Sequence, residues 1–211
     1  DTFGFPIDLT KEILSEKGMS VDEDRFRALV LQQRETARAS RKNAGADAWA
    51  GDSDVLDDIA KTEFVGYTDM KTTAKVTAIV KDGARVEAAE TGDDIVFTLD
   101  RTSFYAESGG QIGDTGVITN DSCTIRVLDT TKNAAGVFIH KAVVEEGFLR
   151  EGDTVEVVVD VERRRAIMRN HTAAHLLQAA LRSVLGDHVE QAGQLVNENA
   201  VRFDFTHFSA L

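Results

Sequence analysis

The sequence has little cysteine and no long apolar stretch, and each absence excludes a class of protein. Cys123 is the single cysteine among 211 residues, so no disulfide can form within the chain, and a reducing, cytoplasmic location is expected. No apolar run approaches the ~20 residues that a membrane helix requires, so no membrane partner is expected. The opening DTFGFPIDLT has neither an initiator methionine nor a signal-peptide pattern. Together with the abrupt ending RFDFTHFSAL, it predicts an internal piece of a longer protein.

Basic residues are also in deficit. The chain has 24 Lys and Arg against 36 Asp and Glu, which gives a formal net charge of −12. Such a balance excludes a general coat for nucleic acid, and DNA is not an expected partner, although local basic patches can still position RNA. The apolar content of 42% and charged content of 28% are ordinary for globular proteins, and the length allows more than one domain.

The first sixty residues have a helical pattern. A first helix is predicted from Pro6 to Gly18, and a second begins near Asp22, where acidic residues favour a helix N-terminus. A stripe of arginines follows on the second helix, a quarter turn from its apolar face: Arg27, Arg34, Arg38 and Arg41. This stripe is either a solvated face or a row of contacts to RNA phosphates.

The hydrophobic period changes at about Thr62, and from there to Asp160 short β-branched runs alternate with turn residues. Asp82-Gly83 is a strong hairpin signal within this region. The spacing predicts an antiparallel barrel or sandwich, so the fold class is α+β. The predicted strands are Glu63–Tyr67, Ala74–Val80, Val86–Ala88, Ile95–Leu99, Gly116–Ile118, Thr124–Asp129, Phe138–Ala142 and Thr154–Val159. The predicted domains are a helical segment over 1–61, a barrel over 62–160 and an incomplete α+β unit over 161–211.

A helix is predicted from Arg163 to Leu185, with Asp160 as its N-cap and Gly186 as its C-cap. His171 and His175 are four residues apart, so both lie on one face of this helix. Two imidazoles in this arrangement can bind one metal ion, which could polarise a carbonyl or activate water. The simpler alternative is one half-buried and one solvated histidine. Two ligands also fall short of the three or four that zinc requires. Apolar residues recur at helical spacing along the same segment: Leu177, Leu181 and Val184.

A glycine-rich stretch, FYAESGGQIGDTG, runs from Phe104 to Gly116 within the β region. No Lys-Ser or Lys-Thr follows it, so it is not a P-loop. It is either a structural turn or a loop whose backbone can approach a ligand closely. Nearer the C-terminus, residues 197–205 alternate as in a half-buried strand, and Arg202 and Asp204 on its other face are expected to form a surface ion pair.

Three stretches together resemble the alanyl-tRNA synthetase family: DTFGFPIDLT at Asp1, FYAESGGQIGDTG at Phe104 and HTAAHLLQAAL at His171. The resemblance covers the whole chain and places it between the end of the tRNA-recognition region and the first part of the editing domain. It implies a parent enzyme that uses ATP and magnesium, in an upstream domain outside this chain, to charge tRNA(Ala) with alanine. It also implies hydrolysis of Ser or Gly mistakenly esterified to that tRNA.

The resemblance assigns roles to particular residues of this chain. The zinc of the family's editing site is held by an HxxxH pair, matched by His171 and His175, and by a later Cys-xxx-His pair that has no counterpart here. Cys123 does not match that second pair, and His188 and His207 are the candidates should a third ligand exist. Gln191 falls at a glutamine of the editing pocket, and a loop lining the same pocket is matched by Ser108, Gly109, Gly110 and Gln111. Ala174 stands where the family often has Thr, which leaves a hydroxyl contribution there in doubt.

Two other functions remain open from the sequence. A free-standing deacylase of mischarged tRNA would need the second ligand pair and would lack the helical region before Ala60. A non-catalytic barrel that positions RNA or a neighbouring domain is the alternative from another class. The chain alone is expected to be inactive.

Overall fold

The chain consists of two compact units, Asp1–Ala50 and Gly51–Leu211. The computed structural model describes residues 14, 17–19, 21–22, 25–26, 29, 54–56 and 58–208. In the first unit, Gly18 has a φ of 68°, and the Asp22 carboxylate accepts a hydrogen bond from the Arg25 amide at 2.9 Å. These are the features of a helix end and a helix start, at the two positions where the sequence predicts them. The remainder of the predicted helices, including the arginine stripe, lies outside the described residues.

The second unit contains a closed antiparallel barrel, which confirms the predicted fold class. Six strands pair in a ring, β10-β7-β8-β9-β5-β2, and β2 closes the ring by pairing with β10. Two short strands lie beside the ring: β3 pairs with β2, and β4 pairs with β9. Strand β1 pairs with β6 in parallel. The strand bounds are β1 Glu63–Phe64, β2 Lys71–Lys81, β3 Ala84–Val86, β4 Ala88–Glu90, β5 Asp94–Leu99, β6 Arg101–Thr102, β7 Gly116–Asn120, β8 Cys123–Lys132, β9 Phe138–Arg150 and β10 Thr154–Val159. A 3₁₀ turn, η2 Asp54–Leu56, precedes them.

Alternating side chains explain why these segments form a barrel. In β10, the inward Val155, Val157 and Val159 are buried, whereas the intervening residues are partly exposed. The same alternation in the other strands builds one apolar interior with Phe97 and Phe104 at its centre. The hairpin between β2 and β3 turns at Asp82 and Gly83, whose φ values of 52° and 76° are those of the predicted two-residue turn.

The prediction of one continuous strand over Val86–Ala88 is wrong. The structure breaks it into β3, which pairs with β2, and β4, which pairs with β9. Glu87 lies between them, and its carbonyl accepts a hydrogen bond from the Glu151 amide at 2.9 Å. The break lets the chain leave one strand of the ring and join another.

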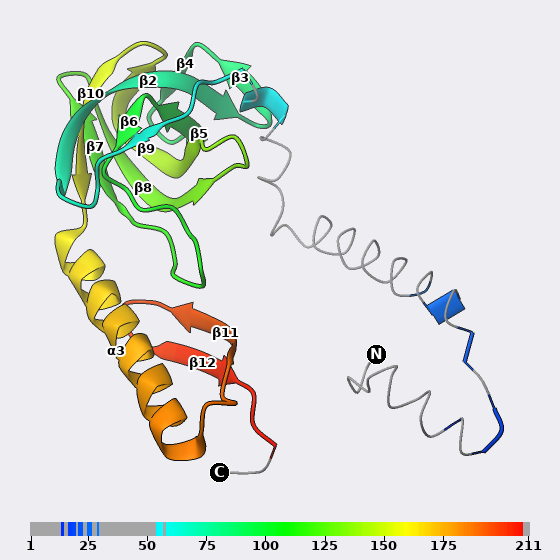
Figure 1. The fold of residues 1–211 in the computed structure, drawn as a ribbon. Helices are drawn as coiled ribbons and strands as arrows, with labels where there is room; N and C mark the ends of the chain where they lie inside the picture. The colour runs from blue at the N-terminus through cyan, green and yellow to red at the C-terminus, as the bar shows by residue number, and fades with distance from the viewer. Residues whose placement is uncertain are drawn as a thin grey trace. The chain divides into compact units, whose positions relative to one another are not determined.

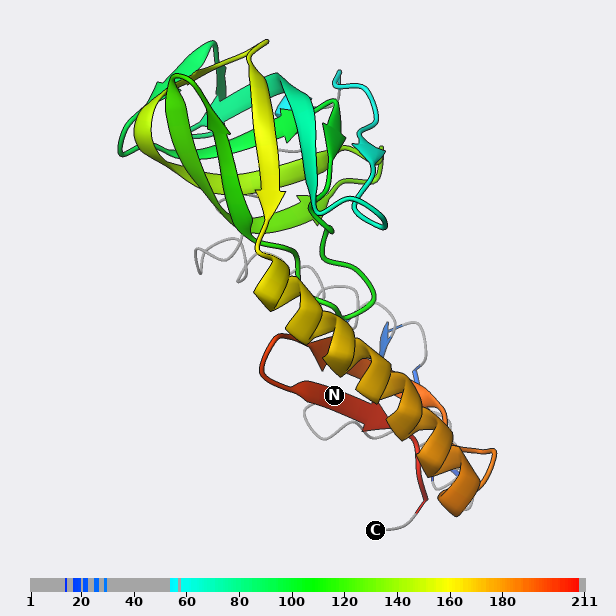
Figure 2. The same cartoon turned by 90° about the vertical axis from the view of Figure 1, so that its left-hand side faces the viewer.

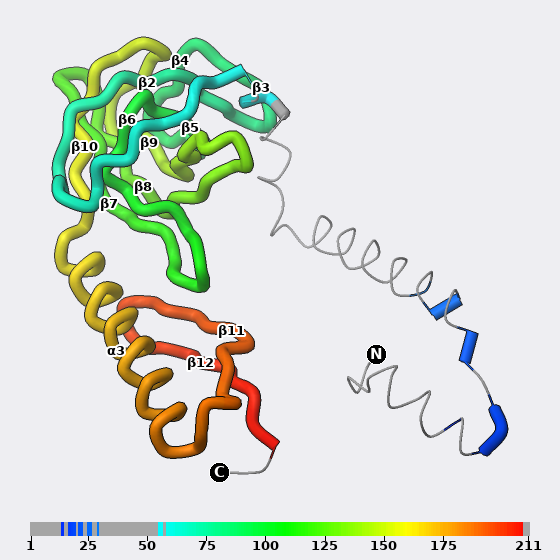
Figure 3. Tube along the Cα trace, viewed as in Figure 1, coloured from blue at the N-terminus to red at the C-terminus, as the bar shows by residue number. Residues whose placement is uncertain are grey.

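The barrel continues directly into a long helix, α3 Val161–Leu185 (Figures 1 and 2). The Asp160 carboxylate accepts a hydrogen bond from the Arg163 amide at 3.0 Å, and the Gly186 amide donates to the Arg182 carbonyl. Both predicted caps are therefore confirmed. Two further strands, β11 Gln191–Val196 and β12 Val201–Phe205, form a hairpin beside α3, which Figure 3 shows as a tube trace. No helix in the described part of the chain has the length and apolarity to cross a membrane.

Candidate functional half-site

The loop between β6 and β7 leaves the barrel and reaches the β11–β12 hairpin (Figure 1). Its tip is a tight turn in which Ser108 and Gln111 exchange backbone hydrogen bonds at 3.0 and 3.1 Å. Gly109 and Gly110 occupy the two central positions with φ values of 59° and 82°, which other residues rarely adopt. The glycines of the predicted site are therefore required by the turn itself.

The same loop adds a short strand-like contact to β11. The Val196 amide donates to the Gly110 carbonyl at 2.7 Å, and the Ile112 amide donates to the Val196 carbonyl at 3.2 Å. A Cβ on Gly110 would overlap the backbone carbonyl of Gln194. Gly110 is thus the residue that lets the loop backbone lie against β11.

Gln111 joins this loop to α3. Its side chain is buried, and its amide oxygen lies 2.5 Å from Nδ1 of His171. Because a carbonyl oxygen only accepts, Nδ1 is the hydrogen-bond donor in this contact, and Nε2 is the ring nitrogen left for another partner. A hydrogen bond of this kind at one nitrogen is what orients a metal-binding histidine at the other.

His171 and His175 stack on one face of α3. Their ring centroids are 5.1 Å apart, and the ring planes differ by 9°. His171 is half-buried and His175 is exposed, which also agrees with the simpler alternative of two ordinary helix histidines. The hydrogen bond to Gln111 is compatible with both interpretations, since a half-buried imidazole needs a partner whether or not it binds a metal ion.

The residues present fit a zinc ion only in part. The two imidazoles supply neutral nitrogen ligands of the kind zinc accepts. Among the described residues, however, no group of three or more His, Cys, Asp or Glu side chains converges. His188 and His207 are hydrogen-bonded to each other at 2.8 Å. The described residues therefore offer two neighbouring imidazoles, fewer than the three or four ligands that zinc requires.

Strand β11 runs alongside α3 in the opposite direction. The Asn170 side chain donates to the Asn197 carbonyl at 2.7 Å, and the Gln178 side chain donates to the Val189 carbonyl at 3.3 Å. Gln191 opens this strand with an exposed side chain, whereas the loop contacts its far end. The structure therefore places Gln191 near the middle of α3 and away from the Ser108–Gln111 turn.

The residue that the sequence analysis did not identify is Gln194. Its side-chain amide donates to the Gly109 carbonyl at 2.6 Å and fixes the tip of the loop. No periodicity in QAGQLV distinguishes this glutamine from Gln191 three residues earlier. Only the pairing of β11 with the loop reveals its contact.

Buried charge holds the loop and the helix against the barrel. The Arg164 Nε atom donates to Asp114 Oδ2 at 2.7 Å, and the same guanidinium donates to the carbonyls of Gly66 and Ser103 at 2.9 Å. The neighbouring Arg163 donates to the Gly113 carbonyl at 2.8 Å. These contacts fix the start of α3, and through it the direction in which the histidines point.

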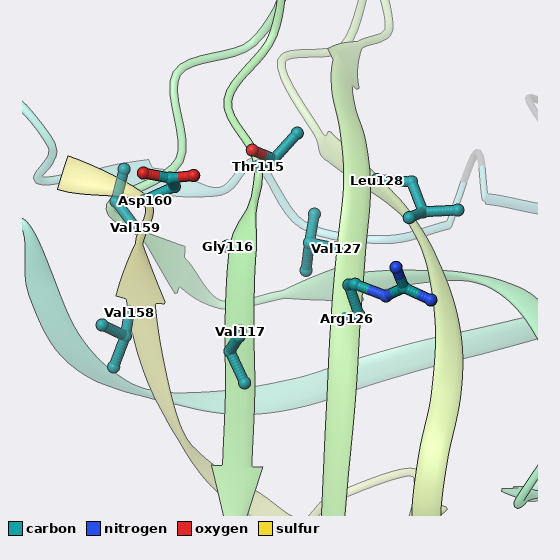
Figure 4. Close-up of a pocket in the computed structure, with 9 residues that line it drawn as sticks. All are labelled: Thr115, Gly116, Val117, Arg126, Val127, Leu128, Val158, Val159 and Asp160. Atoms are coloured by element: carbon teal, nitrogen blue, oxygen red, sulfur yellow. The ribbon is translucent and has the colours of Figure 1, made fainter. Parts of the chain in front are cut away.

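A hollow of about 480 Å³ lies on the barrel wall beside the start of α3 (Figure 4). It is lined mainly by apolar side chains of β7, β8 and β10, and none of the predicted site residues belongs to it. Its two charged side chains already have partners, since Asp160 caps α3 and Arg126 pairs with Glu145 at 2.7 Å. The charged groups of this hollow are therefore already engaged, and Thr115 contributes a hydroxyl group to its lining.

Comparison with known proteins defines the family. Residues 1–163 match the family of tRNA synthetases class II (A), and the chain belongs to that family. The whole chain is 48% identical to the alanine–tRNA ligase of Acetivibrio thermocellus and 50% identical to that of Thermoanaerobacter sp. (strain X514). It is 46% identical to the enzyme of Clostridioides difficile (strain 630). In each case it spans 24% of the relative's length.

Proposed function

We propose that the chain is the part of an alanine–tRNA ligase that connects tRNA recognition to the editing of mischarged tRNA. In this proposal the whole enzyme is cytoplasmic and charges tRNA(Ala) with alanine, using ATP and magnesium in a domain outside this chain. It also hydrolyses Ser-tRNA(Ala) and Gly-tRNA(Ala). The contact between Gln111 and His171 carries the editing part of the proposal, because it brings together the two motifs that the family resemblance links to one pocket.

The family match favours this proposal over a free-standing deacylase. The match begins at residue 1 and includes the region before the barrel, which such a deacylase lacks. The two-ligand helix supports an inactive chain within an active enzyme, since no third ligand lies among the described residues. As an isolated molecule the chain would then act as a positioning module for RNA.

The predicted site residues have separate tasks in the proposed hydrolysis. His171 and His175 would hold zinc, which when bound would polarise the ester carbonyl or a water molecule. Gln111 would accept the hydrogen bond from Nδ1 of His171 and so orient the plane of the ring. The Ser108–Gln111 turn places backbone close to the helix, so that a small amino acid fits and a larger one is rejected by shape. Gln191, at the other end of β11 from the turn, would border the pocket along α3.

Editing of this kind is needed because an alanine pocket discriminates weakly against near neighbours. One extra methylene or hydroxyl changes binding by only about 1–3 kcal/mol in an apolar pocket. A second site that hydrolyses the wrong ester supplies the missing selectivity. Placing that site on a separate helix and loop leaves the charging chemistry undisturbed.

The test uses the full-length enzyme that contains this chain and tRNA(Ala) carrying Ser. His175→Ala should abolish release of Ser while alanine charging stays within about twofold, because the charging site lies in another domain. Gln111→Ala should lower zinc affinity about 10–100-fold, as is typical for loss of a residue that orients a ligand. Equal loss of charging and editing in His175→Ala would show that the histidines are structural and would overturn the assignment.

A further inference from the structure

A group of aromatic rings opens to solvent at one end of the barrel, beside β1 and the β8–β9 connection. Phe64 and Phe138 stack with centroids 5.4 Å apart and planes within 10°. Tyr67 meets Phe64 edge-on at 4.9 Å, and Tyr105 meets it edge-on at 6.2 Å. Phe138 is buried, but Tyr67 is 85% exposed. The group therefore extends from buried Phe138 to exposed Tyr67, and packing in the core does not explain the position of the Tyr67 ring.

The turn that presents Tyr67 is fixed on both sides. The amides of Thr68 and Asp69 donate to the Val65 carbonyl at 3.2 and 3.1 Å. The Gly66 carbonyl accepts a hydrogen bond from buried Arg164, and a Cβ on Gly66 would overlap the Ser103 carbonyl. The exposed ring thus stands on a rigid turn, so little conformational entropy is lost when a flat ligand binds to it.

Positive charge surrounds the same rings. Phe64, Tyr67 and Phe138 line a hollow of about 750 Å³ that also contains Lys61 and Lys132. Lys132 Nζ lies 5.5 Å from the centroid of Phe138, and neither lysine has a salt bridge to a described residue. Glu63, the acidic residue of the lining, is paired with Arg101 at 2.7 Å. The hollow is therefore locally basic in a chain of net charge −12.

We propose that this hollow binds an unpaired nucleotide of RNA. The base stacks on Tyr67, and Lys61 and Lys132 contact the adjacent phosphates. An aromatic ring and free ammonium groups are the elements with which proteins hold single-stranded nucleic acid. An apolar protein partner fits less well, because it would bury two lysines that have no salt bridge among the described residues. The choice of RNA over another nucleotide ligand rests on the proposed function.

The geometry also suggests how the hollow relates to the half-site. Tyr105, one of the rings, begins the segment that carries the Ser108–Gln111 turn, and its amide donates to Asp114 Oδ2 at 2.7 Å. Tyr105 thus joins the loop that carries the turn to the rings of β1 and β9, since it meets Phe64 edge-on. A strand of RNA held at Tyr67 would be anchored to the same support as the editing pocket.

The test measures binding of the full 211-residue chain to a fluorescein-labelled, unstructured oligouridylate of about eight nucleotides by anisotropy at low salt. Tyr67→Ala should weaken binding about tenfold, which corresponds to about 1.4 kcal/mol, and Tyr67→Phe should leave it unchanged. Lys61→Gln combined with Lys132→Gln should reduce the slope of log K against log salt by about 1.4.

Phe148→Ala is the matched control. Phe148 is also an exposed ring on the barrel, 41% accessible, with the Arg150 guanidinium 4.6 Å from its centroid. Its removal should not change RNA binding. Equal effects of Phe148→Ala and Tyr67→Ala, or unchanged binding of an oligomer without bases, would overturn stacking at Tyr67. No binding by the wild-type chain would also overturn the inference.

Failure of this inference and failure of the proposed function are distinguishable. If the hollow does not bind RNA, oligouridylate binding fails while Ser release by the full-length enzyme still depends on His175. If editing is wrongly assigned, Ser release is indifferent to His175 while oligouridylate binding still depends on Tyr67.

Discussion

The Asp114 carboxylate and the Arg164 guanidinium form a buried ion pair that fixes the first turn of α3 to the barrel. The two side chains are 1% and 6% exposed, and Arg164 uses its other donors on backbone carbonyls of two further segments. A charge removed this far from water is stable only while its partner is present. The pair therefore fixes the orientation of α3 relative to the barrel.

Loss of one partner of this pair should be costly. Asp114→Ala leaves Arg164 buried without a counter-charge, and we expect the free energy of unfolding to fall by about 3–5 kcal/mol. Urea denaturation measures this change. Asp204→Ala is the control, because the Arg202–Asp204 pair is exposed and its loss should cost far less. Similar costs for both variants would show that burial of the Asp114–Arg164 pair contributes nothing.

The stability of the barrel should depend on pH through His140. Its ring is buried between Phe97 and Phe104, and burial lowers the pKa of His140 from 6.5 to about 4. The folded state thus binds the proton less readily than the unfolded state. The contribution of neutral His140 to the free energy of unfolding is complete above pH 6.5 and is lost as the pH falls towards 4. The loss is at most about 3 kcal/mol. Its NMR titration should show a neutral ring at pH 5.5, and a midpoint near 6.5 would contradict the prediction.

Two adjacent glycines provide a matched pair of substitutions. Both have positive φ, but a Cβ on Gly109 meets no atom within 4 Å, whereas one on Gly110 overlaps the Gln194 carbonyl. Gly109→Ala should cost about 1 kcal/mol for the backbone conformation alone. Gly110→Ala should cost about 1–3 kcal/mol more, because the loop must separate from β11. Urea denaturation of both variants checks this order, and equal costs would contradict the contact between the loop and β11.

The chain should bind zinc weakly. Two histidines form an incomplete ligand set, and His188 and His207 satisfy each other. Equilibrium dialysis of the purified chain should therefore find less than one tightly bound zinc ion, with no change in His171→Ala. Tight stoichiometric zinc that is lost in His171→Ala would reveal a third ligand within the chain, and His188→Ala and His207→Ala would then identify it.

The arginine stripe predicted from the sequence lies outside the described residues, and its role stays a prediction. If Arg27, Arg34, Arg38 and Arg41 contact the tRNA backbone, replacing Arg34 and Arg38 with Gln should weaken tRNA binding by the full-length enzyme at low salt. The salt dependence should also become flatter, since fewer counterions are released. Filter binding across a salt series measures both effects. Unchanged affinity would indicate a plain solvated face.

Local signals in the sequence predicted most of the barrel because local chemistry decides it. Asp82 and Gly83 set a hairpin by themselves, and the alternating valines of β10 have one possible inner face. Strand β9 is longer than predicted, since Glu145 and Glu146 interrupt the apolar alternation while the backbone pairing continues. Strand β11 was not predicted, because QAGQLV has no alternation and depends on β12 and the loop for its pairing.

The helix was predicted correctly, but its buried face was not. The apolar residues that indicated it include Leu177 and Val184, which are 43% and 81% exposed. The face that packs instead carries Arg164, Ile167 and Ala174. Burial of an arginine can be predicted only when its partner is known, and Asp114 is fifty residues away from Arg164 in the sequence. Sequence periodicity thus predicts the presence of a helix more readily than it predicts the contacts of that helix.

Asp160 is the single residue between β10 and α3, and it is where a domain boundary would naturally be drawn. A cut at this point would leave Gln111 on one piece and His171 on the other. A gene rearrangement that exchanged either piece alone would therefore separate His171 from the amide that it contacts, and the transferred helix would need a new hydrogen-bond partner at that position.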